Sequence, residues 1–420
     1  MSAILMPAAD AATPATTTLA PNEPGDDLVA IGSALPADLQ HLPKITIHPD
    51  GVYFGLEEDA YHSDPALGST DIKRLAESPA AYWWASILNP NRETDTDSVA
   101  KMRGRMRHCR LLEGDTTFRS RFRPVPRPDD LPACLDTVDQ IKARIREVNA
   151  TRDAKDRIAL TGSKDELTQR LKQADPTAIF FADALAAYRE GLAKVGGVEA
   201  KREDIADVER DAYYILSNID VGRALRGGVS EVSVFWTEEG VRFKARIDLL
   251  KPFSMGDVKN IANTFDRPFD EVVHLEFARR RLDIQAVHYL AAWKHLKAAG
   301  AEGRVFGDCP FPYADWHTLL CASSEVTFTW IFIQSNGAPI TRIVEVPIGS
   351  LVFDRGIADV KRAKDTYRKC LAEYGLMKPW RDDAPVRVLQ PSDLPRWFLR
   401  DGSQLMPVAG TESAGQAQAA

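Results

Sequence analysis

Two adjoining segments of alternating polarity, EVSVFW (231–236) and VRFKARIDLL (241–250), constrain the fold of this chain more than any other feature. Alternation of apolar and polar residues is the pattern of a strand with one buried face. The dipeptide Glu239-Gly240 lies between the two segments, and a short connection that contains glycine predicts a β-hairpin turn. The chain is therefore expected to contain an antiparallel hairpin with one face in the core, where Val241, Phe243, Ala245, Ile247 and Leu249 point.

Further elements surround this hairpin. Three more strands are expected, at about 254–259, 327–334 and 341–348, the last two forming a pair around Asn336-Gly337. Helical patterns occupy 99–113, 282–299 and 349–374. Strands flanked by helices on both sides predict an α/β (α+β) fold with a mixed sheet.

The chain is expected to form one domain, 41–400, with its core in 229–300. Residues 1–40 are rich in Ala, Thr and Pro without apolar periodicity and predict a disordered leader, and 401–420 predict a disordered tail. The segment 135–227 is helical and charged, and we expect it to be a helical insertion in the domain.

Charge and composition exclude several classes of protein. The 420 residues include 53 Lys and Arg against 60 Asp and Glu, a formal charge of −7, which provides no global attraction to nucleic acid or to an anionic membrane. A local basic groove remains compatible with that charge. No apolar run approaches the roughly 18–20 residues of a membrane-spanning helix, and the start of the chain lacks the features of a secretory signal. The five widely spaced cysteines favour a reducing cytoplasm over a disulfide framework or a zinc finger.

Two carboxylates are expected to meet beside the hairpin. Asp248 lies on the polar face of the second hairpin strand, and Asp257-Val258-Lys259 follows nine residues later. A hairpin connection can bring Asp248 and Asp257 side by side. Two carboxylates and a strand carbonyl are hard oxygen ligands that suit Mg²⁺. A lysine two residues along can orient a metal-activated water or stabilise negative charge in a phosphoryl transition state.

The acid-x-Lys pattern is weak evidence when it stands alone. Four of its five occurrences fall in helical or loop segments, where the two side chains would point in different directions. The occurrence at 257–259 follows a strand that ends with an acid, although a surface ion pair remains the alternative for it. The five are Asp71-Lys73, Asp153-Lys155, Glu199-Lys201, Asp257-Lys259 and Asp359-Lys361.

The next helix offers polar groups that could grip a nucleic acid. Gln285 and Tyr289 are four residues apart and therefore share one helix face, where an amide and a phenol can hold a phosphate or a base edge. Arg279, Arg280 and Arg281 precede this helix.

The helix at 99–113 carries His108 away from its apolar stripe, one turn after Gly104, whose missing side chain would permit close helix–sheet approach. Lys and Arg are frequent between 101 and 127 and predict a phosphate track that includes Arg103, Arg105 and Arg107. The alternatives are a satisfied histidine and a solvated face.

The order of these motifs resembles that of a known group of enzymes. A helical histidine is followed by E-x-S-x-F-W at 231–236, R-x-D at 246–248, D-V-K at 257–259 and Q-x-x-x-Y at 285–289. This order resembles the PD-(D/E)XK nuclease superfamily and, within it, the exodeoxyribonuclease VIII family of prophage recombination exonucleases and their phage relatives. The segments AYHSDPALGSTDIKRLAESPAAYWW (60–84) and LPRW (394–397) are also typical of that family, so the resemblance spans about 52–398.

The resemblance implies a restriction-endonuclease-like core and a Mg²⁺-dependent deoxyribonuclease, with Mn²⁺ as the alternative ion. It implies 5′-to-3′ digestion of linear duplex ends in phage or prophage recombination, in the bacterial or phage-infected cytoplasm. Lys259 would be the catalytic lysine, and Glu231 would serve a second metal or orient water. The implied metal ligands are His108, Asp248, Asp257 and the Val258 carbonyl.

The expected partner is DNA, held by Gln285, Tyr289, Arg103, Arg105, Arg107 and Arg281. A single-strand annealing protein and further copies of the chain are expected as additional partners, and a membrane is not. Two alternatives stay open. One is a catalytically silent DNA-binding or assembly protein on a nuclease scaffold. The other is a CRISPR-associated nuclease with an iron–sulfur cluster, which the lack of a four-cysteine arrangement disfavours.

Overall fold

The computed structural model describes residues 45–93, 98–310, 312–376, 378–382 and 386–394. The expected leader (1–40) and tail (401–420) lie outside the described residues. The chain divides into a unit of residues 1–380 and a unit of residues 381–420. The described residues of the second unit include a 3₁₀ turn at Pro391–Asp393, and the sheets and α-helices belong to the first unit.

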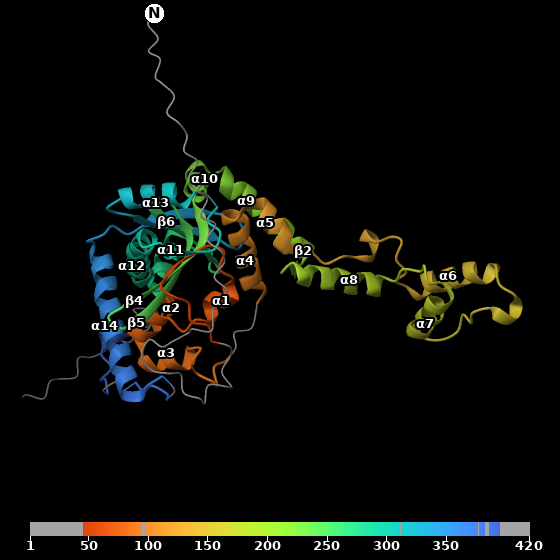
Figure 1. Cartoon of the computed structure of the whole chain (residues 1–420), viewed down its shortest axis with the longest axis horizontal. Helices are drawn as coiled ribbons and strands as arrows, with labels where there is room; N and C mark the ends of the chain where they lie inside the picture. The colour runs from red at the N-terminus through yellow and green to blue at the C-terminus, as the bar shows by residue number, and fades with distance from the viewer. Residues whose placement is uncertain (1–44, 94–97, 311, 377, 383–385, 395–420) are drawn as a thin grey trace, which may run out of the picture. The chain divides into compact units, whose positions relative to one another are not determined.

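Seven strands form one mixed sheet in the order β7-β1-β4-β5-β6-β8-β9. Its strands β4, β5 and β6 are labelled in Figure 1. Strands β4, β5 and β6 are successive antiparallel neighbours, β8 runs parallel to β6, and β9 closes the edge antiparallel to β8. Helices flank the sheet, so the expected mixed α/β fold is confirmed. The strands are β1 Gly51–Tyr53, β4 Val229–Glu238, β5 Val241–Leu250, β6 Ser254–Ile261, β7 Val305–Phe306, β8 Thr327–Gln334 and β9 Thr341–Glu345.

The expected hairpin is β4 and β5. Their register runs from Val229 opposite Leu250 to Glu238 opposite Val241, which leaves Glu239 and Gly240 as a two-residue turn. Both turn residues have positive φ, 49° and 76°, as a type I′ turn requires. The apolar face of β5 is buried as expected.

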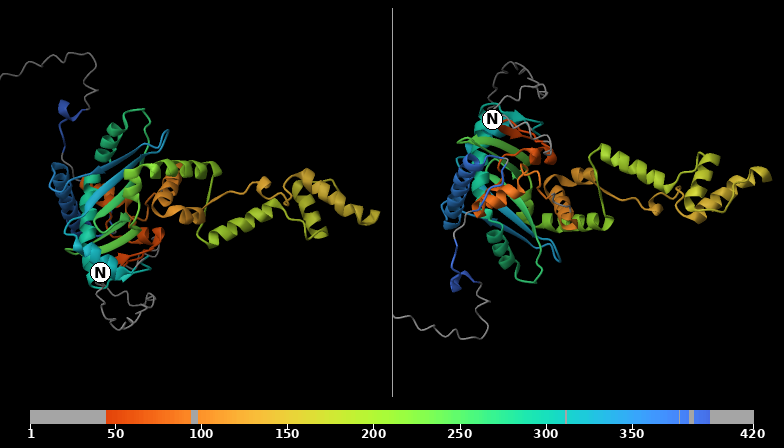
Figure 2. Two further views of the ribbon diagram at one scale, coloured as in Figure 1. Left: turned by 90° about the horizontal axis from the view of Figure 1, so that it is seen from above. Right: turned by 90° about the horizontal axis from the view of Figure 1, so that it is seen from below.

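Helices cover both faces of the sheet, and in the two views of Figure 2 the strands lie between α14 (blue) and α4 (orange). One face packs against a large core that includes residues of α2, α11, α12 and α14. The other face packs Val258, Ile331 and Ile333 against Leu111 and residues of α9 and α10. The helices flanking the sheet are α1 Glu58–Ser63, α2 Ser69–Glu77, α3 Pro79–Ala85, α4 Val99–Leu112, α5 Gly114–Arg121, α9 Arg202–Ser217, α10 Ile219–Leu225, α11 Phe269–Arg279, α12 Leu282–Ala301, α13 Tyr313–Ala322 and α14 Leu351–Tyr374. Among the described helices, none combines the length and apolar character needed to cross a membrane.

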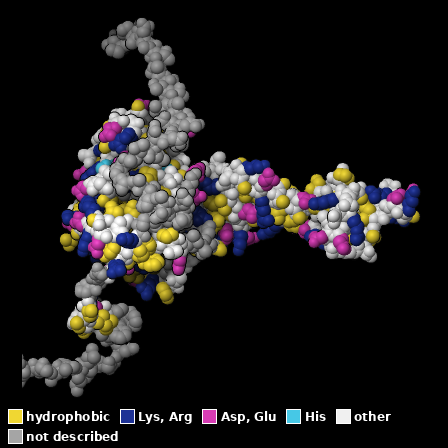
Figure 3. Space-filling view, turned by 60° about the horizontal axis from the view of Figure 1, so that its bottom comes forward, with side chains coloured by type: hydrophobic (Ala, Val, Ile, Leu, Met, Phe, Trp, Pro, Cys, Tyr) yellow, Lys and Arg dark blue, Asp and Glu magenta, His cyan; other side chains and the backbone are white. Residues whose placement is uncertain are grey.

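The helical segment expected at 135–227 has two parts with different packing. Helices α6 Val138–Ala150, α7 Lys164–Ala174 and α8 Phe181–Lys194 follow the short strand β2 Phe122–Pro124 and precede β3 Val198–Ala200, which pairs with it in parallel. The α6–α8 segment has an apolar cluster of its own around Ile141, Ile145, Leu167, Leu171 and Phe180. Its visible surface in Figure 3 mixes positive and negative side chains. Helices α9 and α10, in contrast, pack on the sheet.

The glycine that permits a close helix approach is not the expected one. A Cβ placed on Gly104 of α4 would meet nothing within 4 Å, so its expected role in helix–sheet packing is wrong. A Cβ on Gly356 of α14 would lie 2.7 Å from the carbonyl oxygen of Asp283 on α12. Helices α12 and α14 therefore touch backbone to backbone at Gly356.

Candidate functional site

The site lies where β5 and β6 part. Within the described chain, two pairs join these strands, Leu249 opposite Gly256 and Leu250 opposite Met255. One further step of this register would place Asp248 opposite Asp257. There the Val258 N–H donates to a side-chain oxygen, Asp248 Oδ2, at 3.1 Å. The gap between the strands is thus filled by polar side chains.

Three side chains converge on one side of this gap. His108 of α4 lies with Nε2 2.9 Å from Asp248 Oδ2 and with Nδ1 3.2 Å from Glu231 Oε1. One ligand atom from each of the three residues lies within 4.8 Å of the other two. Arg246 donates to the second oxygen of Glu231. Glu231 has φ 58°, a left-handed conformation that is unusual for a non-glycine residue inside a strand.

The charges of this cluster depend on one another. Burial disfavours the imidazolium of His108, but the carboxylates of Asp248 and Glu231 outweigh it and raise its pKa to about 9. Burial would raise the pKa of Asp248, yet the nearby His108 keeps it below the ordinary value. Burial and the Asp248 charge raise the pKa of Glu231. The two carboxylates therefore favour the protonated form of His108.

Asp257 and Lys259 face the same gap from β6. Asp257 is 2% exposed, its Oδ1 accepts from Gln285 Nε2 at 2.6 Å, and its Oδ2 lies 2.5 Å from Lys259 Nζ. Burial raises the pKa of Asp257, against the lowering effect of Lys259. Gln285 Oε1 is buried and has no hydrogen-bond partner among the described residues. This amide oxygen is thus a buried acceptor whose hydrogen-bonding capacity is unused.

A cleft of about 740 Å³ opens above these groups. Asp248, Asp257, Gln285 and Tyr289 line it, together with six cationic side chains: Lys73, Arg74, Lys259, Arg279, Arg280 and Arg281. A second cavity of about 1570 Å³ shares Asp248 and Tyr289 with it. Acidic groups at the centre and cations around them make a surface that can hold phosphates near a metal.

Lys73 is a cleft residue that sequence reasoning missed. It belongs to one of the acid-x-Lys matches set aside because they fall in helices. Burial, with the nearby Lys259 charge, lowers its pKa to about 8. The position of α2 over the cleft depends on long-range packing, so no local pattern could have singled out this lysine.

The structure brings together several of the expected site residues and separates others from them. His108, Glu231 and Asp248 form the cluster, while Asp257, Lys259, Gln285 and Tyr289 line the cleft. Tyr289 donates its hydroxyl proton to the Arg246 carbonyl oxygen at 2.8 Å. The tight group of possible ligands contains Glu231 where the sequence predicted Asp257.

The expected arginine track differs most from the structure. Arg107 is 5% exposed and bound on two sides by protein groups, so it does not lie on the surface as a phosphate contact requires. Arg103 is paired with Asp204. Arg105 is exposed, with Nη2 3.7 Å from Met102 Sδ. Arg281 lines the cleft but is paired with Asp283 and Asp359.

The donor set fits a hard divalent cation. Glu231 and Asp248 offer carboxylate oxygens and His108 a ring nitrogen, a combination that suits Mg²⁺ or Mn²⁺ better than a thiolate-preferring metal. Carboxylate oxygens of Glu231 and Asp248 lie 3.2 Å and 2.9 Å from the two ring nitrogens of His108, so all three side chains present donor atoms to one point.

Comparisons with known proteins leave the family open. No protein-family model matches the chain, and no curated protein sequence matches it. Among solved structures, it is similar to the crystal structure of a protein from Eubacterium rectale named "Putative exonuclease", at 13% identity and a TM-score of 0.39. The match covers 83% of this chain and 100% of that one. The fold and site define a mixed α/β protein with a candidate metal centre, of which Asp248 also lines a cleft with cationic side chains.

Proposed function

We propose that this protein is a divalent-metal-dependent deoxyribonuclease. The observation that carries the proposal is the meeting of His108, Glu231 and Asp248 at the edge of a cleft whose walls carry six cations. Metal-dependent hydrolysis of a phosphodiester uses both features, because cations hold the phosphates while oxygen ligands hold the metal.

The residues have separate tasks in this reaction. Glu231, Asp248 and His108 would hold the ion, with Asp257 and the Val258 carbonyl on the other side of the gap. The ion would supply polarisation of a phosphoryl oxygen and a lowered pKa of water. Lys259 would orient the attacking water and stabilise the developing negative charge. Its Nζ lies 2.5 Å from Asp257, which fixes it in the cleft.

Gln285 and Tyr289 would position the substrate side of the site. Gln285 donates its amide N–H to Asp257 and would hold that carboxylate in place, while its amide oxygen is buried. Tyr289 is fixed by its bond to the Arg246 carbonyl, so its ring forms a rigid part of the cleft wall.

The motif order supports the finer parts of the proposal. The ion is Mg²⁺, with Mn²⁺ as the alternative, and the enzyme is a 5′-to-3′ double-strand exonuclease of the exodeoxyribonuclease VIII type used in phage or prophage recombination. It works in the cytoplasm as a homo-oligomer with a single-strand annealing protein.

Digestion of end-labelled DNA tests this function. The protein is incubated with linear and with covalently closed circular duplex, with Mg²⁺ or with a chelator. The linear duplex is expected to be digested when Mg²⁺ is present and to survive with the chelator. The closed circular duplex is expected to survive under both conditions. Asp248→Ala is expected to abolish it. Binding of linear duplex without digestion under every metal condition would instead indicate a catalytically silent DNA-binding protein.

A further inference from the structure

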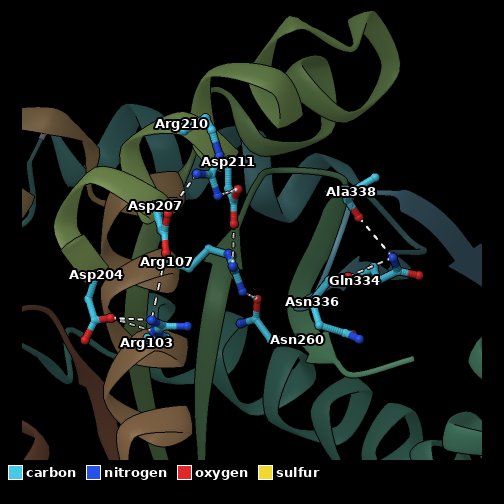
Figure 4. Close-up of polar contacts among 10 residues, drawn as sticks. All are labelled: Arg103, Arg107, Asp204, Asp207, Arg210, Asp211, Asn260, Gln334, Asn336 and Ala338. Atoms are coloured by element: carbon cyan, nitrogen blue, oxygen red, sulfur yellow. Dashed lines mark hydrogen bonds and ion pairs between the residues drawn. The ribbon is translucent and has the colours of Figure 1, made fainter. Parts of the chain in front are cut away.

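Arg107 forms a buried bridge between three elements. It lies on α4, directly before His108. Its Nη2 donates to Asp211 Oδ2 of α9 at 2.6 Å, and its Nη1 donates to Asn260 Oδ1 of β6 at 2.9 Å (Figure 4). Asn260 directly follows Lys259. The guanidinium thus joins the helix of His108 to the strand of Asp257 and Lys259.

A buried ion pair of this kind adds little net stability. Arg107 and Asp211 are 5% and 6% exposed, and taking both charges out of water offsets much of their attraction. Arg107 Nε has no hydrogen-bond partner among the described residues, which further weakens the pair as a stabilising contact. What the planar guanidinium does provide is direction, because N–H groups on its two terminal nitrogens hold Asp211 and Asn260 at a set angle.

The bridge acts beyond the last backbone pair of β5 and β6, where one other hydrogen bond, from the Val258 N–H to Asp248 Oδ2, also crosses the gap. β5 and β6 part beyond the pair Leu249–Gly256, so ladder hydrogen bonds do not set their separation at Asp248 and Asp257. His108 contacts the β4 and β5 side of this gap, and Asp257 and Lys259 belong to the β6 side. The hydrogen bond from Arg107 to Asn260 connects the helix of His108, on the β4 and β5 side, to β6.

We propose that Arg107 and Asn260 are positioning residues that set the distance between the two halves of the metal site. Asp211 holds the guanidinium in place for this purpose. The inference rests on the proposed function, which identifies the site as a metal site. It adds that the contacts of Arg107 and Asn260 determine how tightly the site binds the ion. Groups that hydrogen-bond a metal ligand commonly change metal affinity by about 10–100-fold, and Arg107 and Asn260, one contact further away, are expected at the lower end of that range.

The chain provides a matched control on the same two helices. Arg103 lies one turn earlier on α4 and donates to Asp204 of α9 at 2.8 Å, with Asp207 3.8 Å away (Figure 4). This pair also ties α4 to α9, but no contact with β6 is recorded for it among the described residues. Arg103→Met therefore removes an α4–α9 tie and leaves the bridge to β6 intact.

The test measures Mn²⁺ binding by calorimetry in the absence of DNA. In Asn260→Ala the Arg107–Asp211 pair remains, and the Mn²⁺ Kd is expected to rise about tenfold. Arg107→Lys, which keeps the charge and loses the two-pronged geometry, is expected to do the same. Asn260→Asp keeps an acceptor for Arg107 and is expected to restore the affinity, and Arg103→Met is expected to leave it unchanged. Thermal melting of each variant checks that it is folded.

Digestion of linear duplex by the same variants gives a second measurement. The kcat of Asn260→Ala is expected to fall about tenfold at fixed Mn²⁺ while the KM for DNA stays constant, because the DNA-facing cations are untouched. Equal effects of Asn260→Ala and Arg103→Met, or no effect of Asn260→Ala in a parent that binds Mn²⁺ and digests DNA, would overturn the positioning role alone. A parent that binds no Mn²⁺ and digests no DNA would overturn the proposed function and this inference together.

Discussion

At the scale of single residues, pattern and spacing predict carboxylates better than they predict arginines. Asp248 could be placed because strand alternation fixes which face a side chain takes. Arg103, Arg105 and Arg107 look alike in the sequence, and only the acids of α9, about 100 residues away, decide that Arg107 is buried. Helix periodicity contains no information on such a partner. For this reason Arg107, predicted to contact a phosphate, instead forms a buried bridge inside the protein.

Lys259 can be tested separately from the metal ligands. Lys259→Met is expected to reduce digestion of linear duplex at least about 100-fold, because the charge next to the reacting phosphate is lost. Mn²⁺ affinity is expected to stay the same or rise, since Asp257 no longer shares a cation with Lys259 at 2.5 Å. Calorimetry and digestion of end-labelled DNA measure the two effects. Lys361→Met, on the exposed surface of α14, is the control. Loss of Mn²⁺ binding in Lys259→Met would show that the lysine is needed to build the site.

His288 is expected to make stability depend on pH. It is fully buried, and burial lowers its pKa to about 4. Nε2 lies 2.8 Å from the Lys244 carbonyl oxygen, so the neutral ring donates there. In the unfolded state the His288 ring takes up a proton near pH 6.5. The contribution of the neutral ring to the free energy of unfolding is therefore complete above pH 6.5 and is lost as the pH falls toward 4. The loss is on the order of 3 kcal/mol.

Urea unfolding at pH 7 and at pH 4.5 checks this expectation. Carboxylates also titrate in this range, so the comparison is with His288→Asn, which keeps a donor for Lys244. The variant is expected to lose less stability between the two pH values than the parent does. Equal losses would mean that His288 does not carry the pH dependence.

At the scale of elements, local chemistry predicts the hairpin, and long-range packing determines the rest of the site. The β4–β5 turn was predictable because Glu239-Gly240 can take two positive φ values in succession. The position of α2 beside the cleft was not, since nothing in its sequence specifies contact with Lys259. The packing of α9 and α10 on the sheet was equally hidden, because their amphipathic patterns resemble those of α6 and α7.

Gly356 tests the closeness of α12 and α14. In a helix, Gly→Ala is normally stabilising by about 0.5–1 kcal/mol. At Gly356 the new methyl would lie 2.7 Å from the Asp283 carbonyl oxygen, so Gly356→Ala is expected to destabilise the protein by about 1–3 kcal/mol. Gly104→Ala, where space is open, is the control and is expected to be stabilising. Unfolding in urea gives both values, and a stabilising Gly356→Ala would contradict the close approach.

At the scale of the whole molecule, net charge conceals how charge is distributed. A chain of −7 gives no indication of six cationic side chains around one cleft, and five of these pair with acids beside them. The sequence also does not reveal which segments pack together. The predicted helical segment 135–227 contains one part with its own apolar cluster and another that belongs to the sheet. Periodicity shows that both are helices and does not show what each one packs against.

Removal of the α6–α8 segment tests this division. The cluster around Ile141 and Leu167 shares no residue with the clusters that pack on the sheet. In β2 and β3, Pro124 pairs with Ala200, so the two ends of the segment already lie side by side. Replacing residues 126–196 with a short Gly/Ser linker is therefore expected to leave the core folded. Calorimetric Mn²⁺ affinity and the melting temperature are the measurements, and both are expected to stay close to those of the full chain. An unfolded product would show that the segment stabilises the core through contacts beyond its own cluster. A folded product with intact Mn²⁺ affinity and weaker duplex binding would instead assign the segment to holding DNA.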